Sequence, residues 1–319
     1  IDPTTPSKPV DPIDPTTPEE PIECPNQPSG TVDVLSTTKP QAYKDNSIIY
    51  GKELELNYRI NGYGHSLILC SCNFNKVQSP KETGGCIYIF TSGGAGPKKQ
   101  NISIIQCTFN ECQSQQGGAI SISTAQSTRF FSINHCTFTK NEASTNGGAI
   151  YFNGIYGTIE NCEFINNKCV NDGSEIYFYC GETSSSSSNP FSITNNKFEI
   201  NDEQATSIIF LNWTANSDFV FNSNKIYITN SGTRYLFKSL GDLSKGTMTY
   251  SSNCISPSKS YLCESDNTVL YNKLESGFPD VCQSNPPTQP TDPTTPSKPV
   301  DPIDPTTPSK PVDPIDPTT

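Results

Sequence analysis

The chain is poor in the side chains on which most enzymes and nucleic-acid-binding proteins depend. Only 17% of its 319 residues are charged, and only two are histidines, His65 and His135. Two histidines leave little material for a metal cluster or a histidine-activated nucleophile, so we expect no metal and no cofactor. Residues 30–285 hold 18 Lys and Arg against 21 Asp and Glu, so no basic face for nucleic acid is expected. The sequence has no run of about 18 apolar residues, and we expect no transmembrane segment in this chain.

Proline is scarce in the middle of the chain and concentrated at its ends. Twenty-one of the 27 prolines lie before residue 30 or after residue 285. There proline recurs at every third position within a twelve-residue unit, DPTTPSKPVDPI. Polyproline II has three residues per turn, so each unit predicts an extended segment of about 37 Å. We therefore assign residues 1–29 and 284–319 to Pro/Thr-rich linkers and residues 30–283 to a folded domain. The repeat is cut within its unit, so we expect the chain to be part of a longer protein.

A repeated block organises the middle of the sequence. Each block reads apolar-x-apolar, then a mostly polar pair, then Cys or Asn, any residue, and an apolar residue. The alternation predicts a short strand with one buried face, and the break in phase predicts a sharp corner before a second strand. A third alternating strand follows most blocks. Three short strands per repeat of about 30 residues are typical of a parallel β-helix, here with about eight coils and a C-terminal cap. The blocks are LILCSCNF (67–74), ISIIQCTF (102–109), FSINHCTF (131–138), GTIENCEF (157–164), FSITNNKF (191–198), FVFNSNKI (219–226) and MTYSSNCI (248–255).

Stacked coils place equivalent residues in columns. The recurring cysteine predicts an inward column of reduced, packed thiols, continued by Asn196 and Asn224. The glycine pairs before the third strand predict a corner whose dihedral angles or tight backbone approach exclude a Cβ atom. The asparagines three residues after the inward Phe suit left-handed turn geometry and can form side-chain ladders. The cysteines are Cys72, Cys107, Cys136 and Cys162; the glycines are Gly84, Gly85, Gly117, Gly118, Gly147, Gly148 and Gly173; the asparagines are Asn141, Asn167 and Asn201.

Thirteen cysteines are many for a reducing compartment, and we expect an extracellular or cell-surface protein. Cys254, Cys263 and Cys282 fall near the end of the predicted stack, where the core needs a cap, and a disulfide among them is expected. The odd total leaves at least one thiol without a partner in the chain. Asn101-Ile-Ser and Asn212-Trp-Thr are candidate glycosylation acceptors.

The motifs GGAI and FxxN, alternating at coil spacing, resemble those of the chlamydial polymorphic outer membrane proteins. GGAI occurs at 117–120 and 147–150, GGCI at 84–87, and FxxN at 138–141, 164–167 and 198–201. The resemblance covers residues 67–240 and implies a right-handed β-helix displayed on a cell surface, with adhesion as its usual role. Related repeats occur in trichomonad surface proteins, and the Pro/Thr spacer makes the chain closer in style to such protist proteins. The shared motifs are structural, so no ligand-binding residue is carried over.

Three functions remain open at this level. The first is a non-catalytic surface module for adhesion or display, whose partner is a host-cell or matrix protein or a glycan. The second is a carbohydrate-active β-helix enzyme or carbohydrate-binding module, for which Glu160, Glu163 and Glu175 are the nearest approach to an acidic group; we expect them to be solvated surface carboxylates. The third is an architectural spacer of a surface coat. An outward column of Tyr88, Tyr151 and Tyr177 is the candidate contact face.

Overall fold

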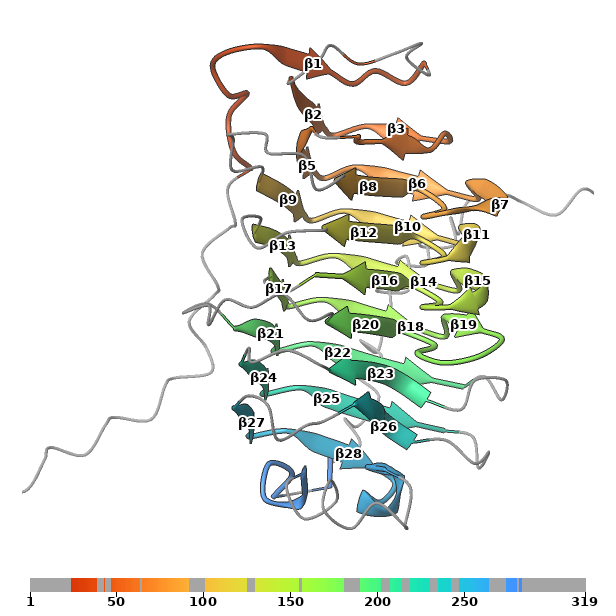
Figure 1. Ribbon diagram of the computed structural model, residues 1–319, viewed down its shortest axis with the longest axis vertical. Coiled ribbons are helices and arrows are strands. Elements are labelled where there is room, and N and C mark those ends of the chain that lie inside the picture. The colour runs from red at the N-terminus through yellow and green to blue at the C-terminus, as the bar shows by residue number, and fades with distance from the viewer. Residues whose placement is uncertain are drawn as a thin grey trace, which may run out of the picture. The chain divides into compact units, whose positions relative to one another are not determined.

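The computed structural model describes residues 24–38, 43, 47–63, 65–91, 101–124, 130–154, 157–180, 190–201, 207–213, 218–229, 235–241, 247–263, 274–279 and 281–282. All of them belong to the unit that spans Ile1–Gln283. The prediction of an all-β protein built from stacked parallel strands is confirmed (Figure 1). The predicted linkers 1–29 and 284–319 lie outside the described residues, except for 24–29.

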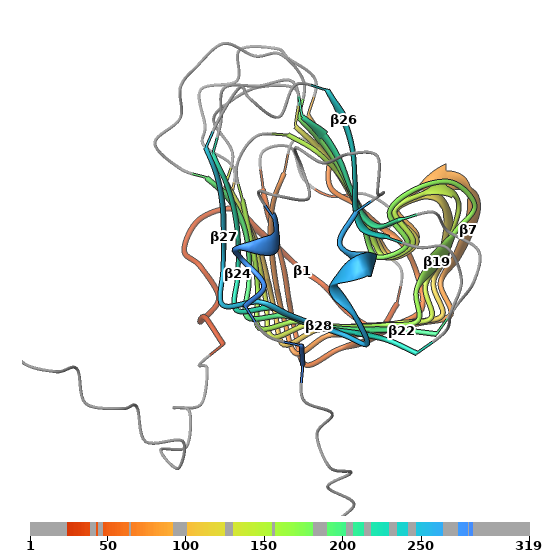
Figure 2. The same ribbon diagram turned by 90° about the horizontal axis from the view of Figure 1, so that it is seen from below.

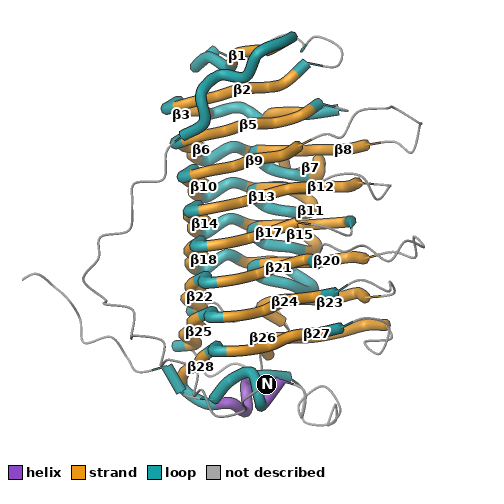
Figure 3. Tube along the Cα trace, turned by 90° about the vertical axis from the view of Figure 1, so that its left-hand side faces the viewer, coloured by secondary structure: helices purple, strands orange, loops and turns teal. Residues whose placement is uncertain are grey.

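Sheet A forms one wall of the stack and contains the strand that opens each coil. Its strands pair in parallel, each with the equivalent strand of the next coil, as Figure 3 shows along the stack. Side chains alternate, so that Ile102 and Ile104 are buried while Ser103 between them is partly exposed. The strands in spatial order are β1 (Val32–Val34), β2 (Ile48–Lys52), β5 (Ser66–Cys70), β9 (Asn101–Ile105), β13 (Phe130–Asn134), β17 (Gly157–Glu160), β21 (Phe191–Thr194), β24 (Phe219–Asn222) and β27 (Met248–Ser251).

Sheet B follows sheet A after a sharp corner. One residue with a left-handed backbone makes each corner, for example His135 with φ 52° and Asn161 with φ 54°. This residue belongs to the polar pair at which the sequence pattern changes phase, as the pattern predicted. The strands of sheet B are β3 (Glu55–Leu56), β6 (Asn73–Asn75), β10 (Thr108–Asn110), β14 (Thr137–Thr139), β18 (Glu163–Ile165), β22 (Lys197–Ile200), β25 (Lys225–Ile228) and β28 (Cys254–Ser256).

Sheet C contains the third predicted strand of each coil. Its inward residues, such as Ile150 and Phe152, are fully buried. Its strands are β4 (Ile60–Asn61), β8 (Ile87–Thr91), β12 (Ile120–Thr124), β16 (Ile150–Asn153), β20 (Ile176–Cys180), β23 (Ser207–Trp213) and β26 (Tyr235–Gly241).

Sheet D is a feature that the sequence pattern did not predict. In four consecutive coils an additional short strand lies between sheets B and C, and Figure 2 shows these strands as a lobe beside the outline of the coils. The interior side chains of the lobe are small: Ser114, Ala143 and Cys169 are buried in it. The strands are β7 (Gln78–Thr83), β11 (Gln113–Gln116), β15 (Glu142–Asn146) and β19 (Lys168–Cys169).

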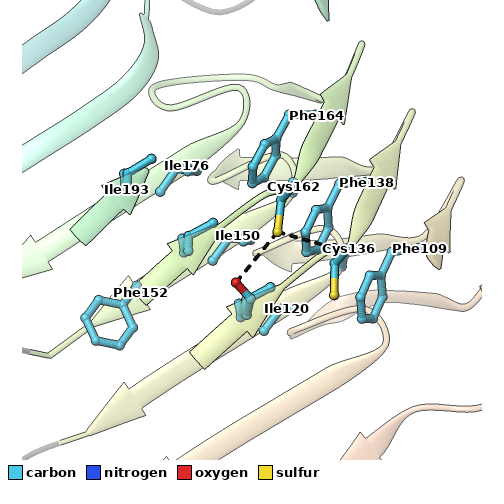
Figure 4. Close-up of a cluster of buried hydrophobic side chains, with 14 of the residues drawn as sticks. Phe109, Ile120, Cys136, Phe138, Ile150, Phe152, Cys162, Phe164, Ile176 and Ile193 are labelled. Atoms are coloured by element: carbon cyan, nitrogen blue, oxygen red, sulfur yellow. Dashed lines mark hydrogen bonds between the residues drawn. The ribbon is translucent and has the colours of Figure 1, made fainter. Parts of the chain in front are cut away.

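The core between the sheets contains columns of identical side chains. The rings of the phenylalanine column stack with centroids 4.9–5.0 Å apart and with interplanar angles of 5–8°, so each ring packs flat against the next. Three of these rings, Phe109, Phe138 and Phe164, are visible in Figure 4 beside Cys136 and Cys162. The column consists of Phe74, Phe109, Phe138, Phe164 and Phe198, all of which are fully buried.

Disulfides join the coils to the segments at both ends. Cys24 belongs to the segment that composition assigns to the first linker, yet it is disulfide-bonded to Cys70 of β5. Cys254 of β28 is bonded to Cys282 beneath the last coil, where Leu274 and Phe278 are buried as a cap. A third bond, between Cys86 and Cys112, ties the lobe at its base. A short 3-10 turn, η1 (Lys259–Tyr261), follows β28.

Candidate functional site

The inward cysteines act as hydrogen-bonding groups as well as packing groups. The backbone N–H of Cys72 donates to Sγ of Cys107, and the same bond of 3.4 Å recurs from Cys107 to Cys136 and from Cys136 to Cys162. Each of these thiols donates to the carbonyl oxygen two residues before it, as Cys162 does to Glu160 at 3.1 Å. The thiols of Cys107, Cys136 and Cys162 therefore each accept a hydrogen bond from the backbone of the preceding coil and donate one to the backbone of their own coil.

The asparagines that continue this column make the same bonds with amides. The N–H of Cys162 donates to Oδ1 of Asn196 at 2.8 Å, and the N–H of Asn196 donates to Oδ1 of Asn224 at 2.9 Å. Nδ2 of Asn196 donates to the carbonyl oxygen of Ile159, and Asn253 closes the column against Gly277. Thiol and amide are thus alternative solutions at one position.

These thiols are unsuited to act as nucleophiles. Burial raises the pKa of Cys107 and of Cys136 well above the ordinary value for a thiol. The pKa of Cys72 is also raised, chiefly by its hydrogen bond with Cys107 and then by burial. A buried thiol that stays protonated at neutral pH is inert. We therefore assign the cysteine column a structural role, as part of the frame of stacked coils.

The predicted turn asparagines require two corrections. Asn141 and Asn167 do not adopt left-handed geometry; the residues before them, Lys140 and Asn166, do, with φ of 51° and 54°. The two asparagines point inward, fully buried, and Nδ2 of Asn141 donates to Oδ1 of Asn167 at 2.8 Å. Asn201 does not join them, since β22 continues through the buried Ile200 instead of turning, and Asn201 is exposed.

The two glycines of each pair have different functions. The first has a left-handed backbone, as in Gly117 with φ 66° and Gly147 with φ 67°. The second lies against backbone: a Cβ on Gly118 would meet the carbonyl oxygen of Gly148 at 2.1 Å, and one on Gly148 would meet that of Ser174 at 2.1 Å. Gly84 is left-handed, with φ 71°, and Gly85 lies against backbone in the same way as Gly118. Gly173 is also left-handed, with φ 71°.

The three glutamates do not form a catalytic group. Glu163 is exposed in sheet B, and Glu160 at the end of sheet A accepts a hydrogen bond from Thr194. The expectation that Glu175 is a surface carboxylate is wrong: it is fully buried, at the position that Ala149 has in the coil before, and it accepts a hydrogen bond from Asn167 at 2.5 Å. One carboxylate inside the coil and one outside it cannot face the same substrate.

The outward tyrosines are only partly assembled. Tyr151 and Tyr177 stack at 5.1 Å, and Phe210 extends the stack at 4.6 Å. Tyr88 does not stack on Tyr151, because Ser121 of β12 lies between them in the register. Burial raises the pKa of Tyr151 to about 12, in agreement with a half-buried ring. Tyr151 and Tyr177 are partly exposed, whereas Phe210 is buried.

A polar groove beside the lobe was not found from the sequence. It has a volume of about 720 Å³ and runs across four coils at the corner between sheets B and D; we call it the corner groove. One ladder along it consists of the left-handed corner residues Lys76, Glu111, Lys140 and Asn166. The second ladder, paired strand to strand, consists of Gln78, Gln113, Glu142 and Lys168. The signal in the sequence was the recurrence of a polar residue two and four positions after Phe74, Phe109, Phe138 and Phe164.

The remaining predicted residues lie apart from this groove. Cys254 and Cys282 form a disulfide, whereas Cys263 is buried near them outside that bond. Asn101 is exposed at the start of β9, and Asn212 is half-buried in β23 with its side chain hydrogen-bonded to Tyr177. Across the ranges that the structure describes, no three His, Cys, Asp or Glu residues gather as metal ligands. Within the same part of the chain, no helix has the length and apolar character to span a membrane.

Comparisons of the chain with protein-family models, with curated proteins and with solved structures give no match.

Proposed function

We propose that this chain is a non-catalytic module of an extracellular or cell-surface protein, which acts in adhesion or display. Its frame is a right-handed parallel β-helix of about eight coils, because crossovers between parallel strands of one sheet are almost always right-handed. Polyproline II stalks at residues 1–23 and 284–319 would hold the module away from its anchor, since Cys24 is already bonded to the coils. The three disulfides among the described residues support an oxidising environment.

The observation that carries the proposal is the contrast between the inside of the coils and the corner groove. The side chains with chemical reactivity, such as Cys136 and Glu175, are buried and hydrogen-bonded within the frame. The groove instead presents eight polar side chains to solvent, four from the corners between sheets B and D and four from the strands of sheet D. A backbone that is held by paired strands favours recognition, because little backbone entropy is lost when a ligand binds.

Adhesion of coated beads tests this function. Beads that carry the full chain should bind to cultured cells or to an extracellular-matrix layer more strongly than beads that carry an unrelated protein. The same preparation, incubated with pectin-like and other acidic polysaccharides, should release no reducing ends. Release of product would favour the enzyme, and the absence of both binding and product would favour the architectural spacer.

A further inference from the structure

We propose that the corner groove binds a linear acidic glycan that lies along the stack of coils, with Lys140 in contact with an acidic group of the ligand. This inference rests on the proposed function and names a ligand class for it.

The shape of the groove favours a chain molecule. Its lining residues come in equivalent pairs from four consecutive coils, so each step along the groove presents one residue from each ladder. Neighbouring coils are about 4.8 Å apart, which is close to the distance between successive sugar units in an extended glycan. An extended peptide repeats about every 3.3 Å and would lose this register within a few residues.

The lining groups suit hydroxyl-bearing ligands. Gln78 and Gln113 each donate one side-chain N–H within the protein, to the carbonyl oxygen of Glu111 and to the carboxylate of Glu142, and Oδ1 of Asn166 accepts the N–H of Asn201. Each amide still has an N–H and an acceptor lone pair for a ligand, while the carboxylates accept and the ammonium groups donate. Sugar hydroxyls need both kinds of partner. The volume of about 720 Å³ lies within the roughly 300–1,000 Å³ of ligand clefts, yet all eight lining residues are charged or carry an amide, unlike those of a cleft for apolar ligands.

The charges in the groove favour an acidic group on the ligand. Lys76 lies 3.5 Å from Glu111, and Lys168 lies 3.1 Å from Glu142, so both carboxylates of the groove already have a cationic partner. Lys140 stands between these pairs and makes no ion pair with any residue in the described ranges. Its exposed ammonium group is therefore available to a carboxylate or sulfate, with which it forms a charge-assisted hydrogen bond.

The groove has a defined end at the coil of Asn166. Oδ1 of Asn166 accepts the backbone N–H of Asn201 at 2.8 Å, and β19 is the last strand of sheet D. In the next coil β22 continues straight to Ile200, so the corner that forms the groove is missing. The site therefore spans four coils, which corresponds to about four sugar units at one unit per coil.

The test is binding of the full chain to a panel of linear uronate, sialate and sulfated oligosaccharides. Each is paired with its neutral counterpart, which is methyl-esterified or desulfated. We expect at least one acidic member to bind about tenfold or more tightly than its neutral counterpart, and Lys140→Gln to weaken that binding about threefold to tenfold. The control is Lys225→Gln, which removes an exposed lysine of sheet B outside the groove and should leave the affinity unchanged.

Three results would overturn the inference: no preference for any acidic member, unchanged binding by Lys140→Gln, or equal losses in Lys140→Gln and Lys225→Gln. Because both lysines are exposed, both variants should keep the wild-type circular-dichroism spectrum and unfolding midpoint. If coated beads adhere to cells while the panel is negative, the ligand class is wrong and the adhesive function stands. If neither binds, both proposals fail.

Discussion

The coils that carry the lobe and the coils that follow it satisfy the same corner with different side chains. The thiols of Cys107, Cys136 and Cys162 each accept the corner N–H of the preceding coil. The amides of Asn196, Asn224 and Asn253 do the same in the coils that follow. Phenylalanine stacks beside both kinds of corner. The comparison teaches that the fold requires an acceptor and a donor at this point, and that either sulfur or an amide meets the requirement.

The glycine pair before sheet C shows the opposite behaviour, since within the described residues it occurs only in three coils that carry the lobe. A Cβ on Gly148 would meet the carbonyl oxygens of Ser174 at 2.1 Å and of Lys168, in the lobe strand β19, at 2.6 Å. Where the adjacent coil has no lobe, the equivalent position is Ser174. The lobe therefore has a specific sequence requirement that the simple coils lack.

The largest expected effect comes from adding a single methyl group at this glycine. Gly148→Ala should lower the free energy of unfolding by about 3 kcal/mol, because the clashing atoms are backbone and cannot rotate away. Urea unfolding measures the change. Ser144→Val, on the exposed side of β15, is the control and should stay within about 0.5 kcal/mol. Similar losses in both variants would contradict a special role for the glycine.

The second prediction exchanges the two kinds of corner. Asn196→Ala removes the acceptor for the N–H of Cys162 and the donor to the carbonyl oxygen of Ile159, both buried. Its expected cost is about 2 kcal/mol. Cys162→Asn extends the amide ladder by one rung and should change stability by less than about 1 kcal/mol. If Cys162→Asn proves as damaging as Asn196→Ala in the same urea measurement, thiol and amide are not equivalent.

The third prediction concerns the pH dependence of stability, which should come from the coils with corner cysteines and not from those with corner asparagines. Burial keeps Cys107 and Cys136 protonated in the folded state, while unfolded thiols ionise near pH 8.5–9. Their raised pKa stabilises the fold below that range, and the contribution is lost as pH rises above it. The slope is up to about 1.4 kcal/mol per pH unit for each thiol.

The urea midpoint, measured at pH 8, 9 and 10, should therefore fall, and Cys136→Asn should reduce the slope by the share of one thiol. Groups that titrate elsewhere in the chain affect both proteins equally and cancel in the difference. Identical slopes for wild type and Cys136→Asn would show that ionisation of this column does not limit stability at high pH.

The smallest effect concerns the two glycosylation acceptors, one in each half. Asn101 is exposed, whereas the side chain of Asn212 is hydrogen-bonded to Tyr177 on the outer face of sheet C. In a chain secreted from eukaryotic cells, mass spectrometry should find Asn101 glycosylated to a higher degree. Asn101→Gln should remove that glycan and change stability by less than about 0.5 kcal/mol. Higher occupancy at Asn212 would indicate that the order of accessibility is reversed.

Sequence periodicity predicted the parallel stack because large apolar residues mark most inward positions of sheets A, B and C. It missed sheet D, since the lobe buries only residues such as Ser114, Ala143 and Cys169, which give no hydrophobic alternation. It also placed the left-handed residue one position late, at Asn141 instead of Lys140. Asparagine often adopts the left-handed conformation, but here the side chain of Asn141 points into the coil and donates a hydrogen bond to Asn167.

The candidate site was harder to predict than the fold, for a physical reason. The corner groove depends on two ladders that meet only because β11 and β15 turn away from sheet B. Spacing along one coil does not reveal which polar residues become neighbours across coils. The outward tyrosines illustrate the same limit, because Ser121 separates Tyr88 from Tyr151 although all three share one column.

The bond from a corner N–H to the side chain of the next coil gives the molecule interchangeable units. Cys107 donates to Cys136 in the way that Cys136 donates to Cys162, so deleting residues 136–161 would bring Cys107 against Cys162 with the same partners. Gene duplication or recombination can thus lengthen or shorten the stack in whole steps of about 4.8 Å without repacking the core. The length of the module can therefore change by one coil at a time, while each remaining corner keeps the same hydrogen bonds.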